Sequence, residues 1–321
     1  MSKKSTENLK KLLQKKGYGF RDFEVYYVVN CTPDDVDWNY KDVIHVDTVH
    51  KTVHGIQTVV TDDVACNINL QNIPIIGIEF PMPVIQYHYS KHSVVYISTL
   101  GPYMVIVNTT FDEIDELKTK IVTKFSIGSK GIFRILNPLI EYILRKNNKL
   151  LMEDDLPMRE RRGELRKNNH LFFKNTENYS FEFSEDRNRS NVYLKKNVKN
   201  IIEVDKKIII DSEDGEIIGN KNGILSFFVS IDKDGLKKIW PSTCSHEGAE
   251  LSKRCLKDNY LSCPWHNRKI NSLMSIKNDN IEITASIDYA IKKTEETFIF
   301  KYRNDPKYYE KKPYKFLKYD N

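Results

Sequence analysis

Two short segments that carry cysteine and histidine constrain this chain more than any other feature of its sequence. The first reads Cys244-Ser-His246 and the second Cys263-Pro-Trp-His266, with sixteen residues between the two segments. Each segment supplies one thiol and one imidazole, and both groups are ligands for transition metals. The two segments are therefore expected to fold as loops that meet around a metal ion or cluster.

Two kinds of metal centre suit this ligand set. Zinc binds two cysteines and two histidines in a tetrahedron, but zinc fingers place both cysteines on one arm and both histidines on the other. In a Rieske [2Fe-2S] cluster, the cysteines hold one iron and the histidines hold the other. The pattern favours the cluster over zinc, with Cys244, His246, Cys263 and His266 as its ligands.

The residues around these ligands resemble the loops of Rieske domains. Gly248, Ala249 and Leu251 follow the first pair of ligands, and Pro264-Trp265 lies inside the second. Rieske proteins of the respiratory cytochrome bc complexes carry an extra cysteine in each loop, where this chain has Ala249 and Trp265. The resemblance implies the oxygenase and soluble ferredoxin branch, and hence a protein that handles electrons.

Composition excludes several other classes of protein. The remaining cysteines, Cys31, Cys66 and Cys255, are odd in number and their spacing does not indicate a disulfide framework. The net charge of +6 is spread over mixed signs, which does not indicate a nucleic-acid partner. No stretch reaches the ~18 apolar residues of a membrane span. We expect a cytoplasmic protein in a reducing compartment, with no membrane span.

The first half of the chain predicts an antiparallel sheet followed by a long helix. Three segments predict strands: residues 94–98, 104–109 and 118–125. Turns are expected at Leu100-Gly-Pro102 and Asp112-Glu113. From Gly131 to Leu144, apolar residues recur every three or four positions, which predicts an amphipathic helix.

The second half predicts a small all-β domain. Residues 176–191 are polar and indicate a linker. Short strands are expected at residues 207–211, 224–231, 281–285 and 297–302. The predicted fold class is therefore α+β. Residues 1–175 would form a helix-grip domain, 176–191 the linker, and 192–321 the cluster domain with a C-terminal tail.

A second group of ligand-type residues lies near the start of the chain. Asp42 and His45 are three apart and are expected to share one face of a helix. His45 and His50 are five apart, so they can bind one metal only if the helix bulges or ends between them. The alternative is an ordinary amphipathic helix that carries histidines.

The expected long helix ends in an acidic run, Glu153-Asp154-Asp155. Two histidines and one carboxylate form the facial triad of non-haem Fe(II) oxygenases, so this run offers the third ligand, either Asp154 or Asp155. The alternative is a solvated helix terminus.

Together these segments resemble the catalytic chain of the Rieske non-haem iron oxygenases. Residues 39–50 match the family's N-x2-D-x2-H-x4-H motif. Residues 154–158 are similar to the D-I-x-I-W segment of the 3-ketosteroid 9α-hydroxylase and cholesterol 7-desaturase branch, and residues 98–107 to the strands that line its pocket. The resemblance implies a START-like catalytic domain.

The resemblance also implies roles for single residues. His45, His50 and Asp155 would bind a mononuclear Fe(II), and Asn39 and Asp42 would be catalytic. Asp42 would bridge a cluster histidine and an iron-binding histidine. The implied activity is hydroxylation or desaturation of an apolar small molecule with O2, and a steroid is one candidate substrate. The alternative is a Rieske electron carrier fused to a START-like ligand-binding domain without mononuclear iron.

Electrons would come from outside the chain. No Gly-x-Gly-x2-Gly follows an expected strand, so we expect a separate reductase, with or without a ferredoxin. The family forms head-to-tail trimers, which implies a homotrimer here. This chain departs from the family in three ways: its cluster domain comes last, Asn267 stands where glycine often follows the second histidine, and Arg159 replaces the usual tryptophan.

Overall fold

The computed structural model describes residues 3–60, 64–73, 78–88, 90, 92–172, 190–278 and 280–303. The chain divides into two compact units, and the division falls between Glu164 and Leu165. Residues 176–189 of the expected linker and residues 304–321 of the expected tail lie outside the described residues. Among the helices that are described, none has the length and apolar character needed to cross a membrane.

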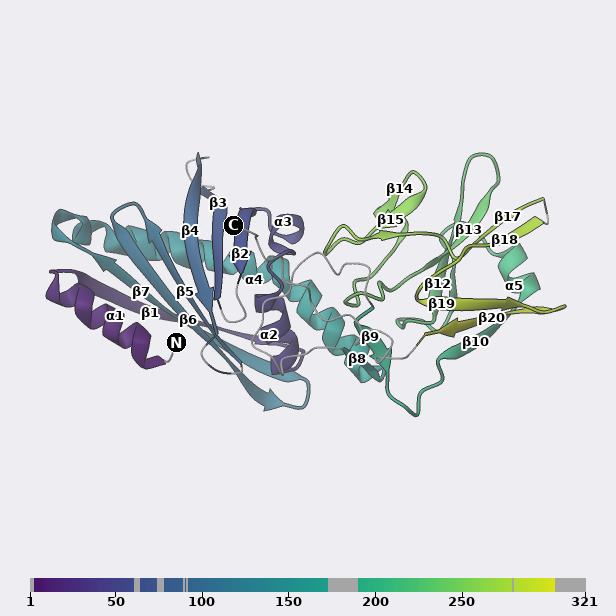
Figure 1. The fold of residues 1–321 in the computed structure, drawn as a ribbon, viewed down its shortest axis with the longest axis horizontal. Coiled ribbons are helices and arrows are strands. Elements are labelled where there is room, and N and C mark those ends of the chain that lie inside the picture. Colours follow the sequence, from purple (N-terminus) through teal and green to yellow (C-terminus); the bar gives the residue numbers. More distant parts are fainter. Residues whose placement is uncertain are drawn as a thin grey trace, which may run out of the picture. The chain divides into compact units, whose positions relative to one another are not determined.

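The first unit combines one sheet with helices. Its helices are α1 (Lys3–Lys15), α2 (Pro33–Lys41), α3 (Val46–Val49), the 3-10 helix η1 (Gly131–Leu136) and α4 (Asn137–Lys167). Its strands are β1 (Gly19–Val29), β2 (Val53–Val60), β3 (Val64–Ile73), β4 (Ile78–Tyr87), β5 (Ser93–Leu100), β6 (Tyr103–Asp115) and β7 (Lys118–Ser129). They form a seven-stranded antiparallel sheet in the order β1-β7-β6-β5-β4-β3-β2 (Figure 1).

The two faces of this sheet differ, because side chains alternate along each strand. In β7, Ile121 and Phe125 are buried whereas Lys120 and Lys124 are exposed, as the alternation in the sequence predicted. The face that carries Phe125 packs toward α4. Helix α1 lies on the opposite face, where the hydroxyls of Thr6 and Tyr87 are 3.0 Å apart.

The long helix starts later than its apolar period predicted. Residues 131–136 form η1, and Ile132 and Ile135 are each 75% exposed. The first buried aliphatic side chain of α4 is Ile140, which joins a core cluster with Tyr103 and Ile127. The expectation of a buried helix face from Gly131 is therefore wrong for the first two turns, because a short 3-10 helix on the surface occupies them.

A second correction concerns the turn before β7. The sequence predicted a turn at Asp112-Glu113, but β6 continues to Asp115. The turn lies at the next two residues, where the backbone N–H of Glu116 donates to the Asp115 carboxylate at 2.8 Å. The β6–β7 register shifts between Glu113 and Asp115, which accommodates the longer strand.

The second unit is mostly β structure. Its elements are β8 (His170–Phe172), β9 (Val192–Leu194), β10 (Ile201–Asp205), α5 (Lys206–Asp211), β11 (Ile217–Gly219), β12 (Ser226–Ile231), β13 (Lys237–Pro241), η3 (Lys253–Cys255), β14 (Leu256–Lys257), β15 (Tyr260–Ser262), β16 (Lys269–Ile270), β17 (Met274–Lys277), β18 (Asn280–Ile283), β19 (Tyr289–Lys293) and β20 (Thr297–Tyr302). The sheets are β10-β20-β19, β11-β12-β13-β17-β18, β14-β15-β16 and β8-β9.

One expected strand is a helix. Residues 207–211 read as a strand in the sequence, but residues 206–211 form α5. The Asp205 side chain caps this helix by accepting the backbone N–H of Lys207 at 2.7 Å. An N-cap of this kind stabilises a helical turn even in a segment of β-branched residues.

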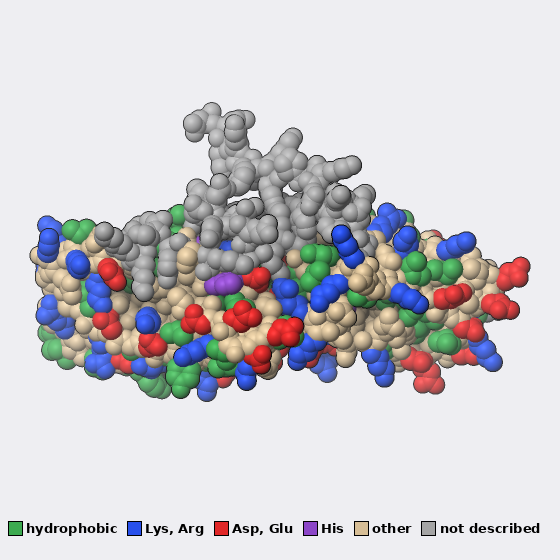
Figure 2. Space-filling model, turned by 90° about the horizontal axis from the view of Figure 1, so that it is seen from below, with side chains coloured by type: hydrophobic (Ala, Val, Ile, Leu, Met, Phe, Trp, Pro, Cys, Tyr) green, Lys and Arg blue, Asp and Glu red, His purple; other side chains and the backbone are tan. Residues whose placement is uncertain are grey.

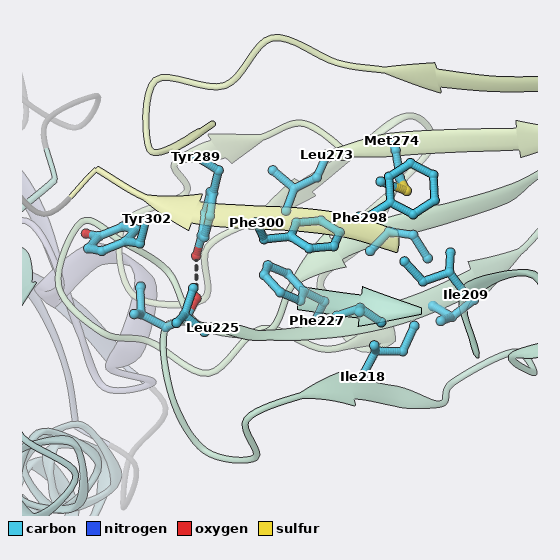
Figure 3. Packing of buried hydrophobic residues seen from close by; sticks show 14 of the residues in the cluster. Ile209, Ile218, Leu225, Phe227, Leu273, Met274, Tyr289, Phe298, Phe300 and Tyr302 are labelled. Carbon is cyan, nitrogen blue, oxygen red and sulfur yellow. Dashed lines mark hydrogen bonds between the residues drawn. The ribbon is translucent and has the colours of Figure 1, made fainter. Parts of the chain in front are cut away.

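An aromatic core supports the second unit. The rings of Phe227 and Phe300 stack with centroids 4.5 Å apart, and both side chains are fully buried (Figure 3). The hydroxyl of Tyr289 donates to the carbonyl oxygen of Ile224 at 2.7 Å, which ties this core to the loop before β12 (Figure 3). The core fixes the frame from which the ligand loops extend.

The predicted fold class is confirmed: an antiparallel sheet packs with a long helix in the first unit, and the second unit is a small β domain. Basic and acidic side chains are interspersed on the face shown in Figure 2.

Candidate metal centres

The two ligand loops of the second unit have the same backbone design. In the first, the N–H of Cys244 donates to the carbonyl of Ala249 at 2.8 Å, and the N–H of Gly248 donates back to Cys244 at 2.9 Å. In the second, the N–H of Cys263 donates to Arg268 at 2.9 Å, and the N–H of Asn267 donates back at 2.9 Å. Each loop therefore closes on its own cysteine.

Both loops need a residue with positive φ four positions after the cysteine. Gly248 has φ +95°, and Asn267 has φ +53°. Asparagine tolerates the left-handed region better than most residues, so Asn267 can stand where the family often has glycine. A Cβ at Gly248 would also lie 2.6 Å from a terminal methyl of the buried Leu165, so glycine is favoured there.

The loops bring the four expected ligands together. The imidazole rings of His246 and His266 lie with centroids 4.9 Å apart and nearly perpendicular. Cys244 and Cys263 are buried, and neither forms a disulfide. Contact with the Cys263 thiol lowers the pKa of Cys244, and the Arg268 charge adds to this effect. Two sulfurs in contact beside two imidazoles fit the donor set of a [2Fe-2S] cluster with mixed ligands.

The second group of ligand-type residues surrounds α3 in the first unit. Helix α2 starts with a capping box at Thr32 and ends at Lys41, so Asp42 lies beyond the helix. His45 is the N-cap of the single-turn helix α3, and His50 is its C-cap. The expectation that Asp42 and His45 share a helix face is wrong, because α2 ends before them. A helix does end between the two histidines.

His45, His50 and Asp155 converge. Their potential ligand atoms lie within 4.8 Å of one another, and all three residues are buried. Oδ1 of Asp155 is 3.2 Å from Nε2 of His45 and 3.4 Å from Nε2 of His50. Two imidazole nitrogens and one carboxylate oxygen that face a common point fit the ligand set of mononuclear non-haem iron.

The other acidic residues, Asp42 and Asp154, contact the Nδ1 side of the histidine rings, away from Asp155. Nδ1 of His45 contacts the backbone carbonyl of Asp42, and the Asp42 carboxylate is 3.6 Å from the same nitrogen. Asp154 lies 3.5 Å from Nδ1 of His50 and accepts the backbone N–H of Lys51 at 3.3 Å. Such contacts orient imidazoles so that their Nε2 atoms face the metal position. Of the two candidate carboxylates, Asp155 is the one that faces both rings.

The electrostatics of this group are strongly coupled. Burial opposes protonation of His45, but the Asp155 and Asp42 carboxylates raise its pKa to about 10. Burial, with the charge of His45, lowers the pKa of His50, although the carboxylates of Asp155 and Asp154 oppose this effect. Burial would raise the pKa of Asp155, but Arg159 and His45 hold it well below its usual range. The carboxylate is therefore anionic and available as a ligand.

A cavity of about 250 Å³ lies beside these three residues. Its wall is built by Val53 of β2, by alternate residues of strands β3 to β7, by the segment from Asn39 to His50, and by α4. Apolar side chains include Met82, Val84, Leu100, Val105, Val107, Phe125 and Leu144. Buried carboxamides interrupt the apolar wall: Oδ1 of Asn67 and Oδ1 of Asn148 have no hydrogen-bond partner within the described part of the chain.

Comparison with known proteins identifies one part of the chain. Residues 203–283 match the family described as Rieske [2Fe-2S] domain. This range includes all four ligands of the two loops. Residues 203–283 are a Rieske [2Fe-2S] domain. No curated protein matches the chain.

Three solved structures that resemble the chain each cover less than half of it. The di-domain aromatase/cyclase BexL from the BE-7585A biosynthetic pathway is 12% identical, with a TM-score of 0.40 over 44% of this chain and 50% of its own. The Zhui aromatase/cyclase from Streptomyces sp. R1128 is 12% identical, with a TM-score of 0.38 over 45% of this chain and 96% of its own. Dicamba monooxygenase is 14% identical, with a TM-score of 0.33 over 44% of this chain and 48% of its own.

The match thus spans about half the length of BexL and of dicamba monooxygenase. These likenesses are too weak to transfer an activity or a substrate.

The second unit holds further polar residues beside the cluster ligands that sequence patterns did not reveal. Arg268 donates to Ser245 at 2.7 Å and to Asp288 at 3.1 Å, and it also contacts the Cys244 sulfur. Ser245 donates to the same carboxylate at 2.6 Å. Asp288 lies twenty residues after Arg268, and no local spacing in the sequence indicates this pairing.

A segment before the loops also supports the Rieske ligands. The backbone N–H of Asn191 lies 3.1 Å from the carbonyl of Ser245 and 3.0 Å from that of His246. Its side chain donates to Glu247 at 2.6 Å. Asn191 was expected to belong to the linker, but its contacts hold it against the first ligand loop.

Proposed function

We propose that this chain is the oxygenase component of a Rieske non-haem iron system. The observation that carries the proposal is the convergence of His45, His50 and Asp155 at the wall of a mainly apolar cavity, in a chain that also has a Rieske domain. The reaction would be hydroxylation or desaturation of a small molecule with O2. When bound, the mononuclear iron would supply oxygen activation, and the cluster would supply electrons one at a time.

The residues of the cavity would bind and orient the substrate. Apolar side chains on β2, on β4 to β7 and on α4 favour a substrate with an apolar body. The buried oxygens of Asn67 and Asn148 need hydrogen-bond donors, because an unsatisfied buried polar atom is unfavourable. The substrate class we propose is therefore an apolar molecule with at least one hydroxyl or amine group.

Asp42 and Asn39 would act from behind the metal ligands. The Asp42 backbone carbonyl and carboxylate both face Nδ1 of His45, so Asp42 fixes which nitrogen of the ring reaches the metal. We propose that its carboxylate also links His45 to a cluster histidine of a neighbouring chain. Asn39 donates to Oδ1 of Asp155 at 3.3 Å, which orients the third ligand.

The proposal needs partners. A separate reductase, with or without a ferredoxin, would supply the electrons. A head-to-tail homotrimer would bring the Rieske domain of one chain to the iron of the next. A cytoplasmic location is part of the same proposal.

One observation favours the second candidate, an electron carrier with a ligand-binding domain that has no iron. The guanidinium of Arg159 lies 2.8 Å from the Asp155 carboxylate, so the buried negative charge is already paired without a metal. In that case, the cavity would bind a ligand, and the histidines would serve only to close its wall.

Iron content distinguishes the two candidates. The oxygenase should hold about three iron atoms per chain, two in the cluster and one in the mononuclear site, and the carrier about two. The count should be repeated after anaerobic addition of Fe(II). His50→Ala should lower it by about one while the visible spectrum of the cluster stays unchanged. A wild-type count that remains near two after Fe(II) addition would exclude the oxygenase.

A further inference from the structure

Arg159 is a fully buried cation in direct contact with a candidate metal ligand. Its Nη2 donates to Oδ2 of Asp155 at 2.8 Å, one turn earlier on α4. Its Nε and Nη2 both donate to the side-chain oxygen of Asn39, at 2.9 and 2.5 Å. The guanidinium also lies over the Tyr40 ring, 5.0 Å from its centroid. These contacts fix the position of the guanidinium.

The two oxygens of Asp155 consequently have different surroundings. Oδ2 faces Arg159, whereas Oδ1 faces Nε2 of both His45 and His50. Oδ1 also accepts the weak hydrogen bond from Asn39 at 3.3 Å, which occupies only one of its two lone-pair sites. A charge-assisted hydrogen bond to arginine is among the strongest that a carboxylate makes, so Oδ2 is not free to turn toward a metal.

We propose that Arg159 is a positioning residue that makes Asp155 a one-oxygen ligand. This inference rests on the proposed mononuclear site and adds a feature specific to this chain. A carboxylate without such a partner can bind a metal through both oxygens. By holding Oδ2, Arg159 keeps one more position on the metal available to substrate and oxygen.

Arg162 provides a matched comparison on the same helix. It is also fully buried, and its Nε donates to the Asp35 carboxylate at 3.0 Å. Its guanidinium stacks on Trp38, 3.9 Å from the ring centroid. Asp35 is not a candidate ligand, so Arg162 shares the structural role of a buried arginine without a contact to the metal site.

The test uses cobalt in the full-length protein with its cluster in place. The mononuclear metal is removed anaerobically with a chelator and replaced with Co(II), and X-ray absorption is recorded at the cobalt K-edge. Cobalt is a different element from the cluster irons, so the spectrum reports only this site. The variants are Arg159→Gln, Arg159→Met, Arg159→Lys and Arg162→Gln.

We expect Arg159→Gln and Arg159→Met to gain one oxygen ligand and to lose pre-edge intensity. Arg159→Lys should keep the wild-type spectrum, because an ammonium at the same helix spacing can still hold Oδ2. Arg162→Gln should lower the thermal midpoint and leave the spectrum unchanged. A wild-type spectrum in both Arg159→Gln and Arg159→Met, or a wild-type protein in which Asp155 already binds through two oxygens, would overturn the inference. If wild-type protein takes up no Co(II), the mononuclear site itself fails.

Discussion

Gly248 and Asn267 occupy equivalent positions in the two ligand loops of the Rieske domain. Each lies four residues after a cysteine, and each donates its N–H to the carbonyl of that cysteine at 2.9 Å. Both have positive φ, but a Cβ at Gly248 would lie 2.6 Å from Leu165. The two positions therefore share a backbone requirement and differ in the space around them.

We predict that Gly248→Ala and Asn267→Gly differ sharply in stability. The alanine would be strained by the left-handed conformation, by about 1–2 kcal/mol, and would also clash with Leu165. Asn267→Gly should change the free energy of unfolding by less than about 0.5 kcal/mol, because glycine adopts the same φ. Thermal midpoints and cluster content of the two variants check this prediction. Equal losses in both would contradict it.

Asp42→Asn should leave both metal centres occupied but slow the turnover of the proposed reaction. The amide can still lie beside His45, so both metal centres should fill, but its neutral group no longer balances charge on the imidazole. We expect turnover to fall about 10- to 100-fold, the range found for residues behind metal ligands. The measurements are iron content and the rate at which a reduced cluster is reoxidised in the presence of O2.

Asp47→Asn is the control for that variant. Asp47 lies in α3 between the two histidines, but its side chain is 65% exposed. It should retain the wild-type rate. A wild-type rate in Asp42→Asn would remove the bridging role.

Arg268 should raise the reduction potential of the cluster. Reduction adds a negative charge to the cluster, and the sulfur of Cys244 would carry part of that charge. The Arg268 guanidinium contacts this sulfur and would therefore stabilise the reduced form. Arg268→Gln should lower the potential by tens of millivolts, and Arg268→Lys should recover part of the difference. Lys269→Gln changes an exposed neighbouring charge and should have little effect. Redox titration followed by visible circular dichroism measures all three.

His88 should make the protein less stable in mild acid. Burial, with the nearby charge of Lys41, lowers the pKa of His88 to about 3. Asp37 faces the ring at 3.6 Å, and burial raises the pKa of that carboxyl. Because the folded pKa of His88 lies below the unfolded value of about 6.5, the unfolded chain binds an additional proton below that pH.

The contribution of His88 to stability is therefore complete above pH ~6.5 and decreases as the pH falls toward the folded pKa, by up to about 1.4 kcal/mol per pH unit. Thermal midpoints between pH ~7.5 and ~5 should fall less steeply in His88→Gln than in the wild type. His54→Gln, which changes a half-exposed histidine, should keep the wild-type slope. Parallel slopes for all three proteins would contradict the assignment.

The sequence was most informative where ligand chemistry and spacing act locally. One thiol and one imidazole in each of two short segments predicted the Rieske loops, and alternation in residues 118–125 predicted the faces of β7. Patterns failed where a local cap or a surface position overrode them. Asp205 caps a helix in a segment that reads as a strand, and Ile132 and Ile135 face solvent despite their spacing.

The sequence predicted one part of the candidate iron site, and the fold was needed for the rest. The motif at residues 39–50 named His45 and His50, but only the fold shows that α2 ends before Asp42 and that α3 separates the histidines. The sequence left Asp154 and Asp155 as alternatives, and the fold directs Asp155 toward both rings. Arg159 stood out in the sequence as a departure from the family, and its spacing from Asp155 is that of an ion pair on a helix.

By itself, then, the sequence determined the kinds of ligand atoms, the cluster type and the order of sheet, helix and β domain, because these depend on residue chemistry and on periods of a few residues. The tertiary structure decided which carboxylate faces the histidines and which oxygen of Asp155 contacts Arg159. It also decided that Arg268 contacts Asp288 beside Cys244. Those relationships join residues far apart in the chain, and only packing brings them within reach of one another.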